Sequence, residues 1–282
     1  MRYCRRVKPD AHLTSIKGWT HDQRQRLLDW ALTAERRPAV LGIAGAQGSG
    51  KSTLAALLVA DARQRGLRAV ALSIDDFYLT RGQRQQLARR IHPLLATRGP
   101  PGSHDVPLAL TTLDTLRHLA PGQQSTVPRF DKLGDTRRPP SRWPKVSGPL
   151  DLIVLEGWCL GAVPEAEAAL AEPINALEAE DDGDGRWRRW VNAALAEYSP
   201  LWRAIDRLLF LAAPGFETVP EWRWQQERDL AAGDARRGMS RAQLNRFVQH
   251  YERLTRHMLR TMPAIAGRTV ALDAQRRPVA GI

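Results

Sequence analysis

The fold is decided by the stretch Gly45-Ala46-Gln47-Gly48-Ser49-Gly50-Lys51-Ser52, which Thr53 follows directly. The stretch matches the pattern G-x-x-x-x-G-K-[S/T], typical of a phosphate-binding loop between a strand and a helix. Its glycines let backbone N–H groups surround phosphate oxygens, and the next helix adds its positive dipole end. We predict that residues 45–53 bind ATP, that Lys51 reaches the reacting phosphates and that Ser52 binds Mg²⁺. The alternative is a glycine-rich turn without a ligand.

The segments around this loop predict an α/β fold. Residues 39–44 form a short apolar run suited to a buried strand, and residues 54–65 form a helix that Gly66 ends. Similar segments alternate along the chain, with strands expected at 68–74, 150–155, 208–211 and 269–272 and helices at 19–37, 108–119, 187–204, 220–232 and 240–259. This alternation predicts a parallel sheet with helices on both faces, a three-layer α/β/α sandwich.

The chain is expected to form one domain over residues 1–282, because its length suits a single core. Residues 1–38 are predicted to be an N-terminal helical extension. Stretches 98–105 and 128–149 are rich in Pro, Gly and charge, which predicts long loops of the kind that often carry function. The acidic stretch 178–184 is expected to be a solvated surface loop.

The net charge of +12 allows two interpretations. Clustered Lys and Arg could bind nucleic acid, or an arginine-rich surface and a pocket for anions could account for the charge. The basic residues are scattered as pairs, and no nucleic-acid-binding motif accompanies them. We therefore predict a small-molecule substrate and no nucleic-acid partner.

The location of the protein is predicted from what the chain lacks. No apolar run approaches the roughly 18 residues of a membrane helix, and no secretory signal is recognisable at the N-terminus. Cys4 and Cys159 lie far apart and suggest neither a disulfide nor a zinc site. A cytoplasmic protein without membrane contact is expected, and the oligomeric state stays open.

Acidic residues that follow two predicted strands are candidates for catalysis. Asp75 and Asp76 follow the strand at 68–74, and Glu156 ends another strand. Ligands of parallel α/β sheets bind at the carboxyl ends of the strands, so these side chains are expected to face the phosphate loop. We predict that Asp75 accepts the proton of an attacking hydroxyl and that Glu156 holds Mg²⁺ or orients the nucleophile. The alternatives are helix caps for the aspartates and a local ion pair for Glu156.

Polar groups near the long loops suit a small anionic acceptor of the phosphoryl group. The candidates for acceptor binding are Asp76, Tyr78, His104, Asp105, Asp131, Lys132 and Arg137. Lys132 and Arg137 could clamp a carboxylate, for which arginine offers a bidentate fork. The alternative for both is a solvated basic loop.

A charged helix predicted at 220–232 carries further arginines. Arg223 and Arg228 could close over the transferring phosphoryl group, where positive charge stabilises the transition state. The alternative is a surface helix with internal Glu–Arg pairs.

Taken in order, these motifs resemble the D-glycerate 3-kinase family, found in plants, fungi and bacteria within the broader phosphoribulokinase, uridine kinase and pantothenate kinase group. The resemblance is carried by residues 45–53, 73–80, 98–105, 130–132, 156–161, 222–227 and 238–251. It implies a P-loop fold with a five-stranded parallel sheet and a mobile helical lid over 220–240. It also implies phosphoryl transfer from Mg²⁺-ATP to D-glycerate, giving 3-phosphoglycerate, with Asp75 as the base.

The resemblance is weakest at the acceptor loop. After Lys132 the chain continues directly into residues 133–137, where plant-like members carry a longer loop. Two alternatives therefore stay open: a kinase of the same fold acting on a nucleoside or a pantothenate-like alcohol, and an ATP-binding switch that regulates a partner. Asp75 favours a kinase, because a switch does not need to deprotonate an acceptor.

Overall fold

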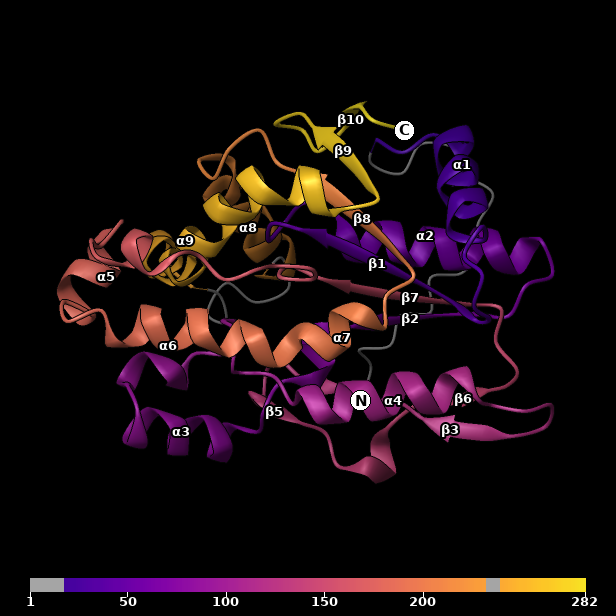
Figure 1. Ribbon diagram of the computed structural model, residues 1–282, viewed down its shortest axis with the longest axis horizontal. Helices are drawn as coiled ribbons and strands as arrows, with labels where there is room; N and C mark the ends of the chain where they lie inside the picture. Colours follow the sequence, from indigo (N-terminus) through magenta and orange to yellow (C-terminus); the bar gives the residue numbers. More distant parts are fainter. Residues whose placement is uncertain (1–17, 232–238) are drawn as a thin grey trace.

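A six-stranded sheet with the order β10-β9-β8-β1-β7-β2 forms the centre of the computed structural model, which describes residues 18–231 and 239–282 (Figure 1). Five of its strands are parallel: β2 (Ala69–Ser73), β7 (Leu152–Gly157), β1 (Ala39–Gly45), β8 (Arg207–Ala212) and β9 (Arg268–Leu272). The predicted five-stranded parallel sheet is thus confirmed. The short strand β10 (Pro278–Ala280), which was not predicted, pairs antiparallel with β9 at the edge.

Alternate residues of the central strands enter two hydrophobic clusters on opposite faces of the sheet. In β1, Leu41 and Ile43 join one cluster, whereas Val40 and Ala44 join the other. The first face is covered by α1 (His21–Ala31), α2 (Lys51–Gln64) and α8 (Thr218–Ala231), and the second by α4 (Val106–Arg117) and α7 (Ser199–Arg203). The long helix α9 (Arg241–Ile265) contributes to both clusters. The three-layer α/β/α prediction is confirmed.

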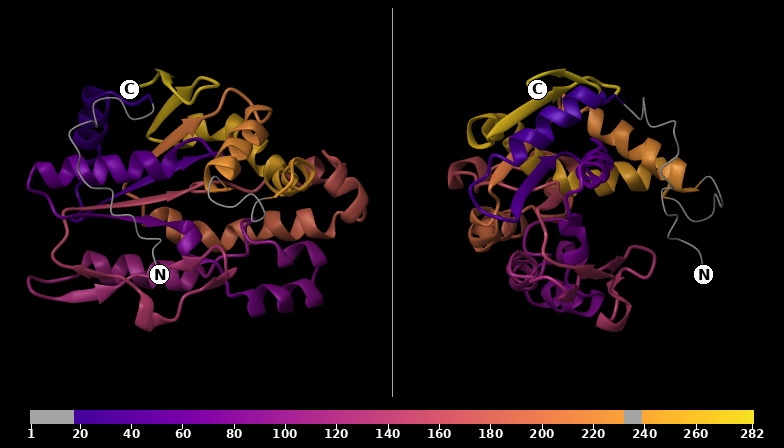
Figure 2. Two further views of the ribbon diagram at one scale, coloured as in Figure 1. Left: turned by 180° about the vertical axis from the view of Figure 1, so that it is seen from behind. Right: turned by 90° about the vertical axis from the view of Figure 1, so that its right-hand side faces the viewer.

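The predicted long loops fold into a layer of short elements on one side of the sheet (Figure 2). Residues 98–105 are irregular, as expected. Residues 128–149 contain β4 (Phe130–Asp131), which pairs with β5 (Thr136–Arg137), a turn of 3₁₀ helix, η4 (Pro140–Arg142), and β6 (Lys145–Ser147), which pairs with β3 (Gln124–Thr126). The same layer includes α3 (Arg81–Arg90) and the 3₁₀ turn η3 (Pro93–Ala96).

The prediction of a solvated loop at 178–184 is wrong. Its first residues belong to α5 (Ala176–Asp181), and the side chains of Glu178 and Asp182 are buried. Glu178 accepts a hydrogen bond at 2.6 Å from Arg253, and Asp182 pairs with the buried Arg188 at 3.1 Å. These carboxylates are buried because arginines of neighbouring elements neutralise them.

Helix boundaries differ from prediction mainly at two places. The helix expected over 19–37 is confined to α1, and residues 1–17 of the predicted N-terminal extension lie outside the described residues, as does Cys4. The helix expected over 187–204 is divided into α6 (Arg186–Ala194), the 3₁₀ turn η6 (Leu195–Tyr198) and α7. Within residues 18–231 and 239–282, no helix has the length and apolar character needed to cross a membrane.

Candidate active site

The phosphate loop lies at the carboxyl end of β1, and α2 begins at Lys51. Gly48 and Gly50 have φ angles of +78° and +91°, and a Cβ on Gly48 would stand 2.7 Å from the Cβ of Trp222. Buried polar atoms of Gln47 and Ser49 have no hydrogen-bond partner among the described residues. Because buried polar groups normally find partners, a loop with several orphaned ones is suited to receive a polar ligand.

Lys51 is buried inside the loop that it follows. Its ammonium group donates to the carbonyl oxygen of Ala46 at 2.8 Å. Burial lowers the pKa of Lys51, while the nearby carboxylates of Glu156 and Asp75 act in the opposite direction. The lysine is thus held at the base of the loop by a backbone contact that a phosphate oxygen could replace.

Ser52 and Glu156 meet because β1 and β7 are neighbours in the sheet. Glu156 is paired in register with Ile43 of β1, and the Ser52 hydroxyl donates to a Glu156 carboxylate oxygen at 2.8 Å. Burial raises the pKa of Glu156, and the charge of Lys51 partly offsets this. A hydroxyl and a carboxylate at one point are hard oxygen ligands of the type that Mg²⁺ prefers, so this pair fits the ion.

Asp75 lies in the 3₁₀ turn η2 (Ile74–Phe77), which follows β2. The side chain that caps this turn is Ser73, so Asp75 does not act as its cap. One carboxylate oxygen of Asp75 accepts from the Tyr78 hydroxyl at 2.7 Å, and the other accepts from the Lys132 ammonium at 3.0 Å. Burial opposes ionisation, but Lys132 and Tyr78 outweigh it and bring the pKa of Asp75 to about 2. The carboxylate is therefore ionised at neutral pH.

The other predicted aspartates bind the chain itself. Asp76 accepts from the backbone N–H of Phe130 at 3.0 Å and pairs with Arg129. Asp105 caps α4 through the N–H of Leu108 at 3.1 Å, and it also pairs with Arg137 at 2.9 Å. Asp131 accepts the N–H groups of residues 133 and 134, both at 3.2 Å. In this structure these contacts hold the loops in place.

His104 is buried behind Tyr78, with the two ring centroids 4.7 Å apart. Its Nδ1 is 2.7 Å from the Tyr198 hydroxyl, and its Nε2 has no hydrogen-bond partner within residues 18–231 and 239–282. Burial lowers the pKa of His104 to about 4, so the ring is neutral at physiological pH. The histidine supports Tyr78 from behind.

A pocket of about 380 Å³ joins the phosphate loop to Asp75. The predicted site residues that line it are Gln47, Gly48, Lys51, Ser52, Asp75, Tyr78, Lys132, Glu156 and Arg223. Those that lie outside its lining are Gly45, Ala46, Ser49, Gly50, Thr53, Asp76, His104, Asp105, Asp131, Arg137 and Arg228. The structure thus brings the candidate base, the loop lysine and the candidate Mg²⁺ ligands together in one cavity.

Comparison with known proteins gives this cavity a context. No family model matches the chain. The uncharacterized kinase mug58 of Schizosaccharomyces pombe is 34% identical over 244 residues, which cover 82% of this chain and 84% of the relative. The chloroplastic D-glycerate 3-kinase of Arabidopsis thaliana is 34% identical over 76% of this chain, a match that covers 46% of the Arabidopsis protein.

A solved structure agrees over nearly the whole chain. The D-glycerate 3-kinase of Cryptococcus neoformans superimposes with a TM-score of 0.75 at 26% identity, and the match covers 92% of this chain and 96% of that one. This chain belongs to the D-glycerate 3-kinase family. Membership also fixes the outline of its chemistry, because the chain is an ATP-dependent kinase with a P-loop fold.

In this member of the D-glycerate 3-kinase family, the pocket contains residues that sequence reasoning did not assign to the site. Three of them, Arg98, Trp158 and Tyr251, join the predicted Tyr78 and Lys132 in the pocket lining, and we call these five residues the aromatic-basic cluster. Arg98, Trp158 and Tyr251 come from the start of a loop, from the end of β7 and from the middle of α9. Spacing along the sequence carries no signal for such a cluster. The available signal was the family resemblance, because each of the three lies in a segment that carries it, namely 98–105, 156–161 and 238–251.

The predicted lid corresponds to α8 and the residues after it. Arg223 lines the pocket and pairs with Glu227 at 3.3 Å, whereas Arg228 is exposed. Trp222 also anchors α8, because its indole N–H donates to the carbonyl of Ala274 at 2.7 Å. Residues 232–238 of the predicted lid lie outside the described residues, and lid closure stays a prediction.

A second hollow of about 360 Å³ lies beside the phosphate loop. It is lined by Gly50 and Thr53 at the start of α2, by Trp19 and by the turn 275–277 between β9 and β10. The main pocket and this hollow both adjoin the phosphate loop. Together they offer room for a ligand that extends beyond its phosphate groups.

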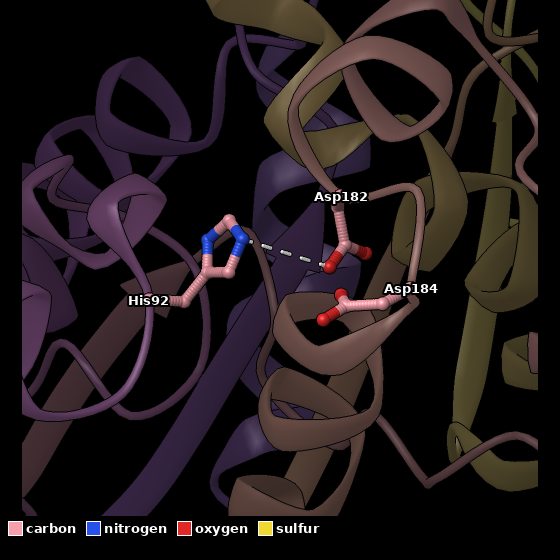
Figure 3. A group of neighbouring side chains, drawn as sticks. All are labelled: His92, Asp182 and Asp184. Carbon is pink, nitrogen blue, oxygen red and sulfur yellow. Dashed lines mark ion pairs between the residues drawn. The ribbon is translucent and has the colours of Figure 1, made fainter.

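One further group of acidic and imidazole side chains has the spacing of metal ligands, but its atoms are satisfied by contacts within the protein. Ligand atoms of His92, Asp182 and Asp184 lie within 4.8 Å of one another, and the His92 ring faces Asp182 across 3.9 Å (Figure 3). The Asp182 carboxylate already accepts from the backbone of Trp187 at 2.6 Å and from Arg188 at 3.1 Å. Because its oxygens are occupied by these donors, this group is a structural ion-pair network.

Proposed function

We propose that this protein phosphorylates a small hydroxy acid with Mg²⁺-ATP, and that D-glycerate, converted to 3-phosphoglycerate, is the substrate. The observation that carries the proposal is the position of Asp75. Its ionised carboxylate lines the same pocket as Lys51, Ser52 and Glu156. A base beside the phosphate site is what transfer to a hydroxyl requires, and a nucleotide switch has no use for one.

In the proposed reaction, the loop backbone and Lys51 bind the β- and γ-phosphates. Ser52 and Glu156 would hold Mg²⁺, which neutralises phosphate charge when bound. Asp75 receives the proton of the acceptor hydroxyl while the hydroxyl oxygen forms its bond to the γ-phosphorus and the bond to ADP breaks. Arg223 adds positive charge to the same pocket. Because phosphoryl transfer depends mostly on positioning and electrostatics, these contacts account for most of the expected rate.

Lys132 is proposed to connect acceptor binding to the base. Its ammonium is bound to Asp75, and its side chain is 65% exposed, so it is free to turn toward an incoming anion. The pKa of Asp75 is about 2 partly because of this contact. Movement of Lys132 to the acceptor would raise that pKa and make the carboxylate a better proton acceptor.

The nucleoside of ATP is proposed to occupy the second hollow, between the start of α2 and the turn 275–277. This proposal is supported by the location of the hollow, which Gly50 and Thr53 of the phosphate-binding segment line. The acceptor itself is suggested by the names of the Arabidopsis and Cryptococcus relatives and by the basic residues of the aromatic-basic cluster. We also propose Mg²⁺ as the metal, because Ser52 and Glu156 offer oxygen ligands at one point, and a cytoplasmic location.

The test is ADP release by the purified protein with Mg²⁺-ATP, with and without D-glycerate, beside a panel of a nucleoside, a neutral polyol and other hydroxy acids. We expect turnover that depends on D-glycerate. Turnover with the nucleoside or polyol instead would replace the proposed substrate. Slow ADP release that no acceptor stimulates would overturn the kinase reaction in favour of a switch.

A further inference from the structure

Arg98 shares one wall of the pocket with the candidate base. Its guanidinium carbon lies 5.5 Å from the centre of the Phe130 ring, and that ring packs edge-on against Tyr78 with the centroids 5.2 Å apart. The Tyr78 hydroxyl in turn donates to Asp75. Arg98, Tyr78 and Asp75 all line the cavity, so a small ligand whose hydroxyl meets Asp75 has a guanidinium within the same space.

The backbone of Arg98 is fixed from two directions. The hydroxyl of Tyr251 on α9 donates to the carbonyl oxygen of Arg98 at 2.8 Å. The indole N–H of Trp158, the residue directly after β7, donates to the carbonyl of Gly99 at 3.0 Å. A Cβ on Gly99 would stand 2.3 Å from the Tyr251 hydroxyl, so only glycine permits this approach.

The guanidinium of Arg98 is fixed by the half-buried carboxylate of Asp135, which the buried Arg84 supports from behind. Its Nη1 donates to Asp135, a residue with a φ of +51° in the hairpin between β4 and β5. Asp135 is held by Arg84, which is 1% exposed and contacts both its carbonyl oxygen at 2.8 Å and its carboxylate at 2.9 Å. Burial opposes ionisation of Asp135, but these two arginines outweigh it and lower the pKa of its carboxyl.

Arg84 connects three separate segments of chain. Besides Asp135, it donates to the carbonyl of Ala96 at 2.6 Å and to the carbonyl of Leu79 at 3.3 Å. Its position therefore links the end of η2, the turn before Arg98 and the hairpin that carries Lys132. A guanidinium buried with this many acceptors is a rigid support, because few of its rotamers keep all the contacts.

We propose that Arg98 recognises the carboxylate of the acceptor, and that Asp135 and Arg84 position its guanidinium for this role. The inference rests on the proposed function, which it deepens by assigning the charge-reading residue. Among the described residues, Arg98 uses only Nη1 in side-chain hydrogen bonds, so the rest of its fork remains for a ligand.

The other cations near the acceptor are less suited to this role. Lys132 neutralises Asp75, and Arg137 is paired with Asp105 outside the pocket lining. Arg223 belongs to α8, whose Trp222 packs on the phosphate loop. Arg98 alone among these combines a fixed backbone and a fixed side chain with a place in the pocket lining, and its planar fork matches a carboxylate.

The test compares D-glycerate with glyceramide, its neutral carboxamide, as acceptors for the wild type, Arg98→Gln and Asp135→Asn. Arg90→Gln, an exposed arginine on α3, is the matched control. We expect Arg98→Gln to lower kcat/KM for D-glycerate on the order of 10²-fold, the worth of a charge-assisted hydrogen-bond pair, with little change for glyceramide. Asn tolerates a positive φ, so Asp135→Asn keeps the backbone and is expected to raise KM for D-glycerate roughly 5–10-fold at nearly constant kcat.

The outcomes separate this inference from the proposed function. A selective loss with the acid, absent in Arg90→Gln, supports the role of Arg98. Equal losses with the acid and the amide would show that Arg98 is structural and overturn the inference, as would an unchanged preference for the acid. A wild-type protein that phosphorylates no hydroxy acid would overturn the proposed function first, and the inference with it.

Discussion

The phosphate loop and the aromatic-basic cluster face the same pocket but are built in different ways. The loop is one continuous stretch, shaped by glycines with positive φ and closed by the first turn of α2. The cluster is assembled from the residues that follow η2 and β7, a long loop, a hairpin and α9. Local sequence can encode a site for phosphates, which all nucleotides share, whereas a site for one particular acceptor requires the tertiary fold.

Among the variants that compare the loop with the cluster, the largest effect is expected on the loop side. Lys51→Met removes the cation that is proposed to reach the reacting phosphates, and we expect kcat/KM to fall on the order of 10³-fold. Steady-state kinetics would measure this loss, with Lys145→Met, an exposed lysine of β6, as the control that keeps activity. A Lys51→Met protein with nearly normal turnover would break the assignment of the loop.

A smaller effect is expected where the loop meets β7. Glu156→Gln keeps the size of the side chain and its contact with Ser52 but removes the charge that would bind Mg²⁺. We expect the Mg²⁺ concentration for half-maximal activity to rise about 10–100-fold, while KM for the acceptor stays constant. A Mg²⁺ titration measures both. A change in the KM for the acceptor alone would contradict Mg²⁺ binding by Glu156 and assign the residue to acceptor binding instead.

In the aromatic-basic cluster, Lys132→Met is expected to change the pH dependence of kcat/KM. The pKa of Asp75 is about 2, and Lys132 is the largest influence that lowers it. Without the ammonium that pKa must rise, so activity that needs the ionised base is lost at a higher pH on the acid side. We expect the acid limb of kcat/KM to move up by about 1–2 units. An unmoved limb would contradict the pairing of Lys132 with the base.

The smallest effect is expected on stability, where alanine variants of Gly48 and Gly50 distinguish steric crowding from backbone strain in the phosphate loop. An alanine at Gly48 meets Trp222 at 2.7 Å, whereas one at Gly50 finds no atom of residues 18–231 and 239–282 within 4 Å, and both glycines have a positive φ. We expect Gly50→Ala to lower the free energy of unfolding by about 1 kcal/mol and Gly48→Ala by about 1–3 kcal/mol more. Denaturant unfolding measures both. Equal losses would show that Trp222 does not pack tightly on the loop.

The sequence predicted the parts of the fold that depend on local pattern. The parallel strands and the phosphate loop follow from apolar runs and from glycine spacing. The break between α6 and α7 was missed, because the apolar pattern continues through the 3₁₀ turn η6 up to Pro200. The buried acids at 178–184 were missed for another reason. Their burial depends on Arg188 and Arg253, and the latter lies far away on α9.

The same limit applies to the site. Lys51, Ser52 and Asp75 follow strands of one parallel sheet and Glu156 lies at the end of another of its strands, so their convergence could be predicted from strand ends. The proposed role of Arg98 could not be predicted in this way, because it depends on Asp135 and Arg84, neither of which belongs to a motif. Arg137 shows the reverse case. It was predicted as a carboxylate clamp, and the structure pairs it with Asp105 instead of placing it in the pocket lining.

The most direct test of the proposed kinase reaction follows the γ-phosphoryl group itself. ATP labelled at the γ-phosphate is incubated with D-glycerate and either the wild type or Asp75→Asn, and the labelled products are separated. The proposed reaction predicts labelled 3-phosphoglycerate from the wild type and a yield about 10²–10⁴-fold lower from Asp75→Asn, with ATP binding unchanged. Label found only as inorganic phosphate, at the same rate in both proteins and with or without D-glycerate, would contradict it.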